Sequence, residues 1–261
     1  EIAKAVDEVA ALIGMADRLK ARPRELGGSE LQRVAIGRTL VTKPAILLLD
    51  EPPSNLETAS RLAMRKELRR LQGEIGLTII YVTHDQVEAL SLADRIAVMN
   101  YGKILQVERT TEICDKPGHV FVAGFLGSPP MNLVRGGFER RGDGVFFHRA
   151  DFTMRVADTL PEGGALPPGL FTLGMRPEAM RLTSQEEGRL HGVVRSVEPR
   201  GPEALLTVAV GSELLTVVAP PVGYPAEGEH IGIDVDPGTL TFFHGDSNRR
   251  IDVSLQGRPR T

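Results

Sequence analysis

Residues 46–57 have the sequence ILLLDEPPSNLE, in which four apolar residues lead into two acids and a Pro-Pro turn. A short, unbroken apolar run is typical of a strand that is buried on both faces of a parallel sheet. Ligands of such sheets bind beyond the carboxyl ends of the strands. We therefore expect Asp50 and Glu51 to project into a binding crevice, although an apolar strand that ends in a charged loop is the simpler alternative.

The segments around this stretch alternate between helical and strand patterns. Apolar residues at helical or strand spacing predict helices over residues 2–20, 31–41 and 57–73 and strands over residues 45–49 and 77–82. The second helix has Ser29 placed as its N-cap. Strand, helix and strand in this order predict a parallel crossover, which is the mark of an α/β domain.

The pattern changes at about residue 127. A further helix follows Asp85, and a hairpin is predicted around Tyr101 and Gly102. After about residue 127, Gly and Pro interrupt short apolar runs, which favours a small all-β domain of sandwich or barrel type. We expect two domains, residues 1–127 and 128–261.

Composition excludes several classes of protein. The 261 residues carry a net charge of −3, and no half of the chain is basic, which argues against nucleic acid as a main partner. The single cysteine, Cys114, cannot form an internal disulfide, and no Cys/His cluster has zinc spacing. No apolar run reaches the roughly 20 residues of a membrane-spanning helix. The chain starts with Glu1, so we expect that this is not the natural start.

Three weak signals converge on phosphate chemistry. At the end of a strand, Asp50 can hold Mg²⁺ while Glu51 polarises a water that attacks a γ-phosphate. Gly27 and Gly28 lead into a helix start, where backbone N–H groups and the helix dipole favour an anion, unless they form only a flexible turn. His84 lies just past the second strand and so in the same crevice, although a lone histidine there is more often an ordinary surface residue.

Four ordered motifs make the chain resemble the nucleotide-binding subunits of ABC transporters, in particular the maltose-type sugar importers. LGGSELQRVAIGRTLVTKP (26–44) resembles the signature motif and its helix, and ILLLDEP (46–52) resembles Walker B. SNLE (54–57) is similar to the D-loop, and VTHDQVEAL (82–90) to the H-loop. VAGFLGSPPMN and LGMRPE resemble the entry to, and a segment of, the regulatory β-domain of these importers.

The resemblance implies a role for each matching residue. Asp50 would hold Mg²⁺, Glu51 would act as general base on water, and His84 would contact the γ-phosphate. In a head-to-tail dimer the signature loop would close over ATP held by the opposite subunit; this loop comprises Gly27, Gly28, Ser29 and Glu30. The D-loop residues that would cross the dimer interface are Ser54, Asn55 and Glu57.

The resemblance also implies a fold, partners and a location. The fold would be α/β, the C-terminal part of a P-loop NTPase domain of ABC type, followed by an all-β, OB-like regulatory domain. The cofactors would be ATP and Mg²⁺. The partners would be a second ATPase subunit in a homodimer or heterodimer, two transmembrane permease subunits and, indirectly, an external solute-binding protein. The protein would sit peripherally on the cytoplasmic face of the inner membrane and drive uptake of a sugar or related solute.

Departures from the family pattern leave a second hypothesis open. Gly27 replaces the usual signature serine, and Glu30 places an anion where glutamine is usual. The phosphate-binding pattern G-x-x-x-x-G-K-[ST] is missing, since the only Gly-Lys pair is Gly102-Lys103. We therefore expect the chain alone to bind ATP poorly and hydrolyse none. The alternative is a dimerising or ligand-sensing β-module with an inert partial ATPase domain. A third hypothesis, a DNA-repair ATPase, is disfavoured because such proteins have coiled coils and basic surfaces that the sequence lacks.

Overall fold

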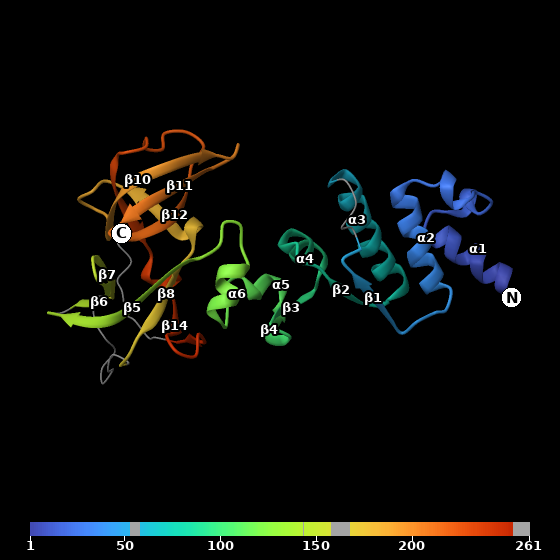
Figure 1. Ribbon diagram of the computed structural model, residues 1–261, viewed down its shortest axis with the longest axis horizontal. Coiled ribbons are helices and arrows are strands. Elements are labelled where there is room, and N and C mark those ends of the chain that lie inside the picture. The colour runs from blue at the N-terminus through green and yellow to red at the C-terminus, as the bar shows by residue number, and fades with distance from the viewer. Residues whose placement is uncertain (53–57, 143, 158–167, 253–261) are drawn as a thin grey trace. The chain divides into compact units, whose positions relative to one another are not determined.

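The computed structural model describes residues 1–52, 58–142, 144–157 and 168–252 (Figure 1). In the helix that starts at Thr58, it describes side chains from residue 61 onward. Contacts divide the chain into two compact units, Glu1–Ile96 and Ala97–Thr261. The expected domain boundary at residue 127 stays a prediction. Within the described residues, no helix combines the length and the apolar character that crossing a membrane requires.

The first unit is built around two parallel strands and the helices that connect them. Its elements are α1 (Ile2–Leu12), the 3-10 turns Ala16–Arg18 and Pro23–Glu25, α2 (Gly28–Leu40), β1 (Ile46–Asp50), α3 (Thr58–Ile75), β2 (Thr78–Val82) and α4 (Gln86–Leu92). Strands β1 and β2 pair in parallel with Asp50 opposite Val82. The predicted strand, helix and strand crossover is therefore confirmed, with boundaries within a few residues of those expected.

Two helix termini differ from the expectation. The helix predicted over residues 2–20 ends at Leu12, because Gly14 adopts a φ of +63° and lets the N–H of Met15 bond back to the carbonyl of Ala10 at 2.7 Å. At α2 the N-cap is Gly27 rather than Ser29. The carboxylate of Glu30, three residues on, accepts the Gly27 N–H at 2.9 Å, so the acid satisfies a terminal donor in place of the expected hydroxyl.

The two-stranded sheet is buried on one face only. Leu47 and Leu49 of β1 lie in the core of this unit with apolar residues of α2 and α3. On the other face Leu48 is 69% exposed. Three further large apolar residues of the two strands are also exposed: Ile46, Ile80 and Val82. The expectation that this strand is buried on both faces is wrong for the described residues, because the helices that pack on the sheet cover a single side.

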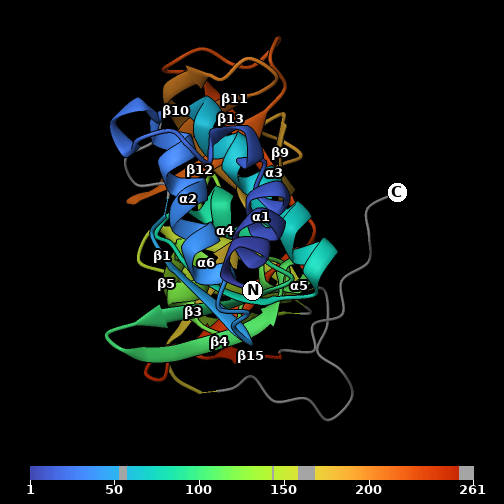
Figure 2. The ribbon, with the colours of Figure 1, turned by 90° about the vertical axis from the view of Figure 1, so that its right-hand side faces the viewer.

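A hairpin that starts at the boundary between the units, and two short helices, precede the β-rich part of the second unit. Strands β3 (Arg95–Asn100) and β4 (Lys103–Arg109) lie side by side, as Figure 2 shows. Tyr101 and Gly102 between them have φ of 45° and 73°, as a two-residue type I′ turn requires, so the predicted hairpin is confirmed. Helices α5 (Thr110–Ile113) and α6 (Val120–Phe125) follow.

Apart from the 3-10 turns Pro177–Ala179 and Pro237–Thr239, the elements of the described remainder of the second unit are all β-strands, as predicted. One sheet has the order β15-β14-β8-β5-β6-β7 and the other the order β12-β11-β10-β13-β9. The strands of the first sheet are β5 (Asn132–Arg141), β6 (Gly144–Arg149), β7 (Phe152–Ala157), β8 (Phe171–Met175), β14 (Thr241–His244) and β15 (Arg250–Ile251). Those of the second are β9 (Met180–Thr183), β10 (Leu190–Pro199), β11 (Ala204–Val210), β12 (Glu213–Ala219) and β13 (His230–Val235).

Apolar side chains from both sheets form one core, in which Phe147, Leu173 and Leu206 are fully buried. The buried amide of Asn132 also joins the two sheets. It donates to the carbonyl oxygen of Thr216 at 2.8 Å and accepts the N–H of Thr216 at 2.8 Å. This paired contact fixes the start of β5 against β12.

Candidate active site

The carboxyl end of β1 carries the two acids that the sequence analysis singled out. Asp50 is the last residue of the strand and is exposed. Glu51 follows with a φ of +43°, a conformation that non-glycine residues adopt rarely and that is often found at functional sites. Its N–H donates to the carbonyl of Val82 at 2.9 Å. This hydrogen bond continues the β1–β2 pairing and holds the turn in place.

The structure brings Glu51 and His84 together. A hydrogen bond of 2.9 Å joins Nδ1 of His84 to Oε1 of Glu51, and both side chains are exposed. The hydrogen bond and the negative charge of Glu51 raise the pKa of His84 above its ordinary value. The two residues that the H-loop and Walker B resemblances single out therefore form a direct pair at one edge of the sheet.

The loop that carries His84 is held from both sides. Asp85 caps α4, because its Oδ1 accepts the N–H groups of Val87 at 2.8 Å and Glu88 at 3.2 Å. On the strand side, Oγ1 of Thr83 accepts the N–H of Asp85 at 3.0 Å. These contacts fix the backbone on either side of His84.

Glu88 completes this arrangement and was missed by the sequence analysis. It is only 3% exposed, and its Oε2 accepts the hydroxyls of Tyr81 at 3.1 Å and Thr83 at 2.9 Å. Burial, and then the charge of Glu88, raise the pKa of Tyr81. The spacing of Asp85 and Glu88 was an available signal, since an acid three residues after an N-cap indicates a capping box. Here the acid turns inward instead and ties α4 to β2.

In the signature loop, the carboxylate of Glu30 binds a backbone N–H of the same loop. Glu30 accepts the Gly27 N–H and pairs with the guanidinium of Arg18 at 3.2 Å. The Gly27 N–H and then Arg18 lower the pKa of Glu30, so it stays anionic at neutral pH. The backbone donor that the resemblance would direct at a phosphate is therefore already occupied by a carboxylate.

The remaining predicted residues fall into two groups. Gly28 and Ser29 are the first residues of α2, whereas Ser54, Asn55 and Glu57 lie outside the described residues. In the described part of the chain, no hydrogen bond or ion pair joins residues 27–30 to Asp50, Glu51 or His84. The helix after the signature loop does reach the acidic edge, because Gln32 donates its amide to the carbonyl of Pro52.

The acidic edge fits a magnesium ion in one respect. The carboxylate of Asp50 is exposed and makes no hydrogen bond or ion pair with another described residue, so its oxygens are free to coordinate. No group of three metal-binding side chains occurs among the residues that the structure describes. A single carboxylate suits Mg²⁺, which commonly takes one or two protein ligands and completes its shell with water and substrate phosphates.

Comparison with known proteins supports the resemblance over almost the whole chain. The family described as ABC transporter matches residues 1–54, and the TOBE domain family matches residues 173–243. The sn-glycerol-3-phosphate import ATP-binding protein UgpC 3 of Rhizobium johnstonii is 42% identical over 256 residues, which cover 97% of this chain and 69% of the relative.

Two further relatives are named for other solutes. The sulfoquinovosyl glycerol transport ATP-binding protein SmoE of Agrobacterium fabrum is 38% identical and covers 94% of this chain and 68% of the relative. The trehalose/maltose import ATP-binding protein MalK of Thermococcus litoralis is 42% identical over 81% of this chain and 58% of the relative. At 42% identity over 69% of the length of such a relative, this chain belongs to the family of ATP-binding proteins of ABC importers.

Proposed function

We propose that this chain acts in an ATP-hydrolysing subunit that drives uptake of a sugar or a related small solute. The observation that carries the proposal is the Glu51–His84 pair beside the free carboxylate of Asp50 at the carboxyl end of two parallel strands. The names of the relatives, which mention glycerol phosphate, sulfoquinovosyl glycerol and trehalose or maltose, support a small polar solute.

The pair suggests a division of work in hydrolysis. Glu51 accepts a proton from a water as the water oxygen forms a bond to the γ-phosphorus. The bond from that phosphorus to the β,γ-bridging oxygen breaks, and ADP and phosphate leave. His84 donates to a γ-phosphate oxygen and stabilises charge there, while it holds Glu51 through Nδ1. Mg²⁺ held by Asp50 would neutralise charge on the phosphates.

The signature loop would act across a dimer. Gly27, Gly28 and Ser29 would meet ATP bound by a second subunit, and this requires Glu30 to release the Gly27 N–H. The D-loop residues proposed for the dimer interface are Ser54, Asn55 and Glu57. The partners would be two permease subunits and, indirectly, an external solute-binding protein, with the ATPase peripheral on the cytoplasmic face of the inner membrane.

The test is steady-state MgATP hydrolysis by the complete protein that carries this sequence, assembled with its permease. Glu51→Gln keeps the shape of the side chain but removes its basicity, so hydrolysis should fall by a factor of about 10² or more. Glu74→Gln is the matched control, because Glu74 is an exposed acid of α3 whose partner among the described residues is Arg70. Asp50→Asn should raise the Mg²⁺ concentration needed for half-maximal rate.

Two results would contradict the proposal. If Glu51→Gln retains the rate of the Glu74→Gln control, Glu51 is not the base. If hydrolysis proceeds normally but is indifferent to solute and permease, the chain does not drive transport.

A further inference from the structure

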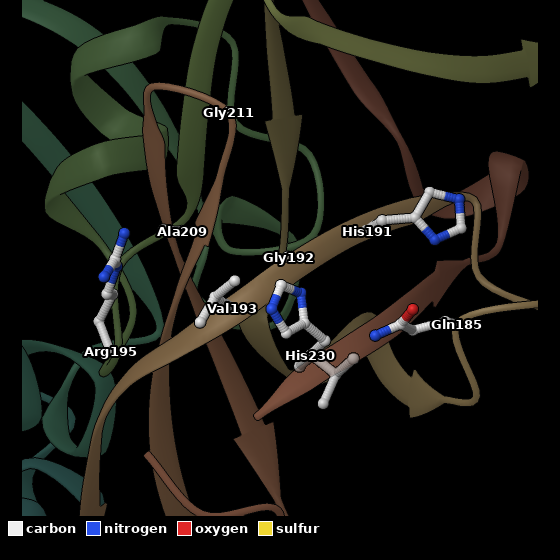
Figure 3. Close-up of a pocket in the computed structure, with 9 residues that line it drawn as sticks. Gln185, His191, Gly192, Val193, Arg195, Ala209, Gly211 and His230 are labelled. Carbon is white, nitrogen blue, oxygen red and sulfur yellow. The ribbon is translucent and has the colours of Figure 1, made fainter. Parts of the chain in front are cut away.

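A groove between α3 and α4 gathers positive charge on the surface of the first unit. Its volume is about 410 Å³, and no Asp or Glu is among the described residues that line it. Its cationic side chains are Arg65, Lys66, Arg69 and Arg70. The hollow that Figure 3 shows on the five-stranded sheet is smaller, about 260 Å³, and among the described residues of its lining Arg195 is the one arginine or lysine. Charge is therefore concentrated in the α3–α4 groove.

The sequence of α3 cannot neutralise two of these cations. Side chains three and four residues apart are neighbours on a helix surface. Around Arg65 the residues at these spacings are Arg61, Leu62, Leu68 and Arg69. Around Lys66 they are Leu62, Ala63, Arg69 and Arg70. Like charges at this spacing destabilise a helix, so a negative charge bound in the groove would relieve a repulsion that α3 cannot relieve itself.

Contacts with other elements leave the same two cations without an acid. Among the described residues, Lys66 makes no hydrogen bond or ion pair. Arg65 donates through Nη1 to the hydroxyl of Ser91 at 3.2 Å, and its Nε is buried without a hydrogen-bond partner in the described part of the chain. The buried acid of α4, Glu88, binds two hydroxyls instead of a cation. The groove thus has two positive charges available for a ligand.

The other two cations of the groove have partners that can be exchanged. Arg69 pairs with Asp94 at 3.1 Å, and Arg70 pairs with Glu74 at 2.7 Å. The side chain of Asp94 is 74% exposed and that of Glu74 is 49% exposed. Exposed ion pairs contribute little to stability, so a ligand carboxylate can replace such a partner at small cost.

The spacing of the cations matches an extended chain. Arg65 and Arg69, like Lys66 and Arg70, are four residues apart, which is about 6 Å along a helix. Alternate side chains of an extended peptide point to the same side and are about 6.6–6.8 Å apart. Acids at alternate positions of such a peptide can therefore face successive cations of α3.

We propose that the α3–α4 groove docks an extended acidic segment of a partner protein, in which acids alternate with apolar residues. The carboxylates bind Arg65 and Lys66 first, as charge-assisted hydrogen bonds. The apolar side chains lie against Leu62, which is 49% exposed, and Leu92. The volume is within the roughly 300–1,000 Å³ of ligand sites. Two available cations are fewer than the roughly 4–8 of lipid-binding clusters, which favours a peptide over a membrane surface.

The experiment measures the fluorescence anisotropy of a labelled peptide, Glu-Leu-Glu-Leu-Glu with blocked ends, as the full chain is added. Binding should saturate and weaken as sodium chloride is raised. A peptide with glutamine in place of glutamate should not bind. Glutarate and vesicles that contain phosphatidylserine are the competitors. Displacement by either at the concentration of unlabelled peptide that displaces the probe would identify a small carboxylate or a membrane as the occupant and overturn the proposal.

Two lysine variants separate docking from general attraction. Lys66→Gln should weaken binding of the acidic peptide about tenfold, the loss expected for one charge-assisted hydrogen bond. Lys4→Gln is the control, because Lys4 is an exposed lysine of α1 in the same unit and the charge change is the same. It should leave affinity within about twofold. Equal loss in the two variants, an unchanged Lys66→Gln, or equal binding of the glutamine peptide would show that the groove is not the docking site.

Discussion

Replacing Glu88 tests whether a buried carboxylate holds the loop of His84. Glu88→Ala removes the acceptor of two hydroxyls, Tyr81 at 3.1 Å and Thr83 at 2.9 Å, in a place where Glu88 is 3% exposed. A buried polar group that loses its partner costs roughly 1–3 kcal/mol. Because the hydroxyls of Tyr81 and Thr83 are only half-buried, the free energy of unfolding of the first unit should fall by about 1–3 kcal/mol, compared with the roughly 5–15 kcal/mol of a typical domain.

A second variant separates the hydrogen bonds from the charge. Glu88→Gln keeps an oxygen that can accept both hydroxyls, so the loss of stability should stay within about 1 kcal/mol. It removes the negative charge that helps to raise the pKa of Tyr81, so that pKa should fall toward its ordinary value. Because the pKa is raised in the folded state, the stability linked to Tyr81 is complete below the ordinary tyrosine pKa and is lost as the pH rises above it.

Two measurements decide the outcome. Amide hydrogen exchange of β2 and α4 reports the stability of the first unit by itself. The absorbance change on alkaline titration reports the three tyrosines, Tyr81, Tyr101 and Tyr224. Glu74→Ala is the control and should cost at most about 1 kcal/mol, because Glu74 makes only a surface pair. The reasoning fails if Glu88→Ala exchanges no faster than this control, or if Glu88→Gln leaves the pKa of Tyr81 unchanged.

Three further outcomes are expected. Asn132→Ala leaves the N–H and the carbonyl of Thr216 without their partner between the sheets. The free energy of unfolding of the second unit, measured by urea unfolding, should fall by about 2–4 kcal/mol. A loss below about 1 kcal/mol would show that water replaces the amide. Leu206→Ala opens a cavity at a fully buried site and should cost about 2–5 kcal/mol in the same assay. Glu51→Gln should lower the pKa of His84 in an NMR titration, because that pKa is raised by Glu51 in the folded protein. The stability that the Glu51–His84 pair contributes is present at low pH and is lost as the pH rises through the pKa of His84 in the folded protein. An unchanged pKa would mean that the pair does not form in solution.

The geometry of the candidate site could be predicted wherever it depends on strand direction. An unbroken apolar run fixed β1, and a parallel crossover forces the ends of β1 and β2 to the same edge. Glu51 and His84 were therefore expected at the same edge, whereas the 2.9 Å hydrogen bond between them is seen only in the structure. The buried core of the β unit was predictable for a similar reason, since alternation along each strand determines which side chains point inward.

Side-chain competition for the same donor could not be predicted. At α2 both Ser29 and Glu30 could bind a terminal N–H. Glu30 binds the N–H of Gly27, and Arg18, twelve residues before Glu30, holds the Glu30 carboxylate in place. At α4 the opposite occurs: Asp85 caps the helix alone, and Glu88 turns toward Tyr81. In both cases the choice depends on a residue from another element, which local sequence patterns do not contain.

The one-sided burial of the β1–β2 sheet makes these local contacts important for the site. Parallel strands usually gain rigidity from layers on both faces. Here Leu47 and Leu49 pack inward, while Leu48 and Ile80 are exposed. Among the described residues, the edge that carries Asp50 and Glu51 is therefore stabilised from a single side, through the packing of α2 and α3 and through the hydrogen bonds that Tyr81 and Thr83 donate to Glu88. Loosening these hydrogen bonds should disturb His84 before it disturbs the rest of the unit, because no described layer on the exposed face can compensate.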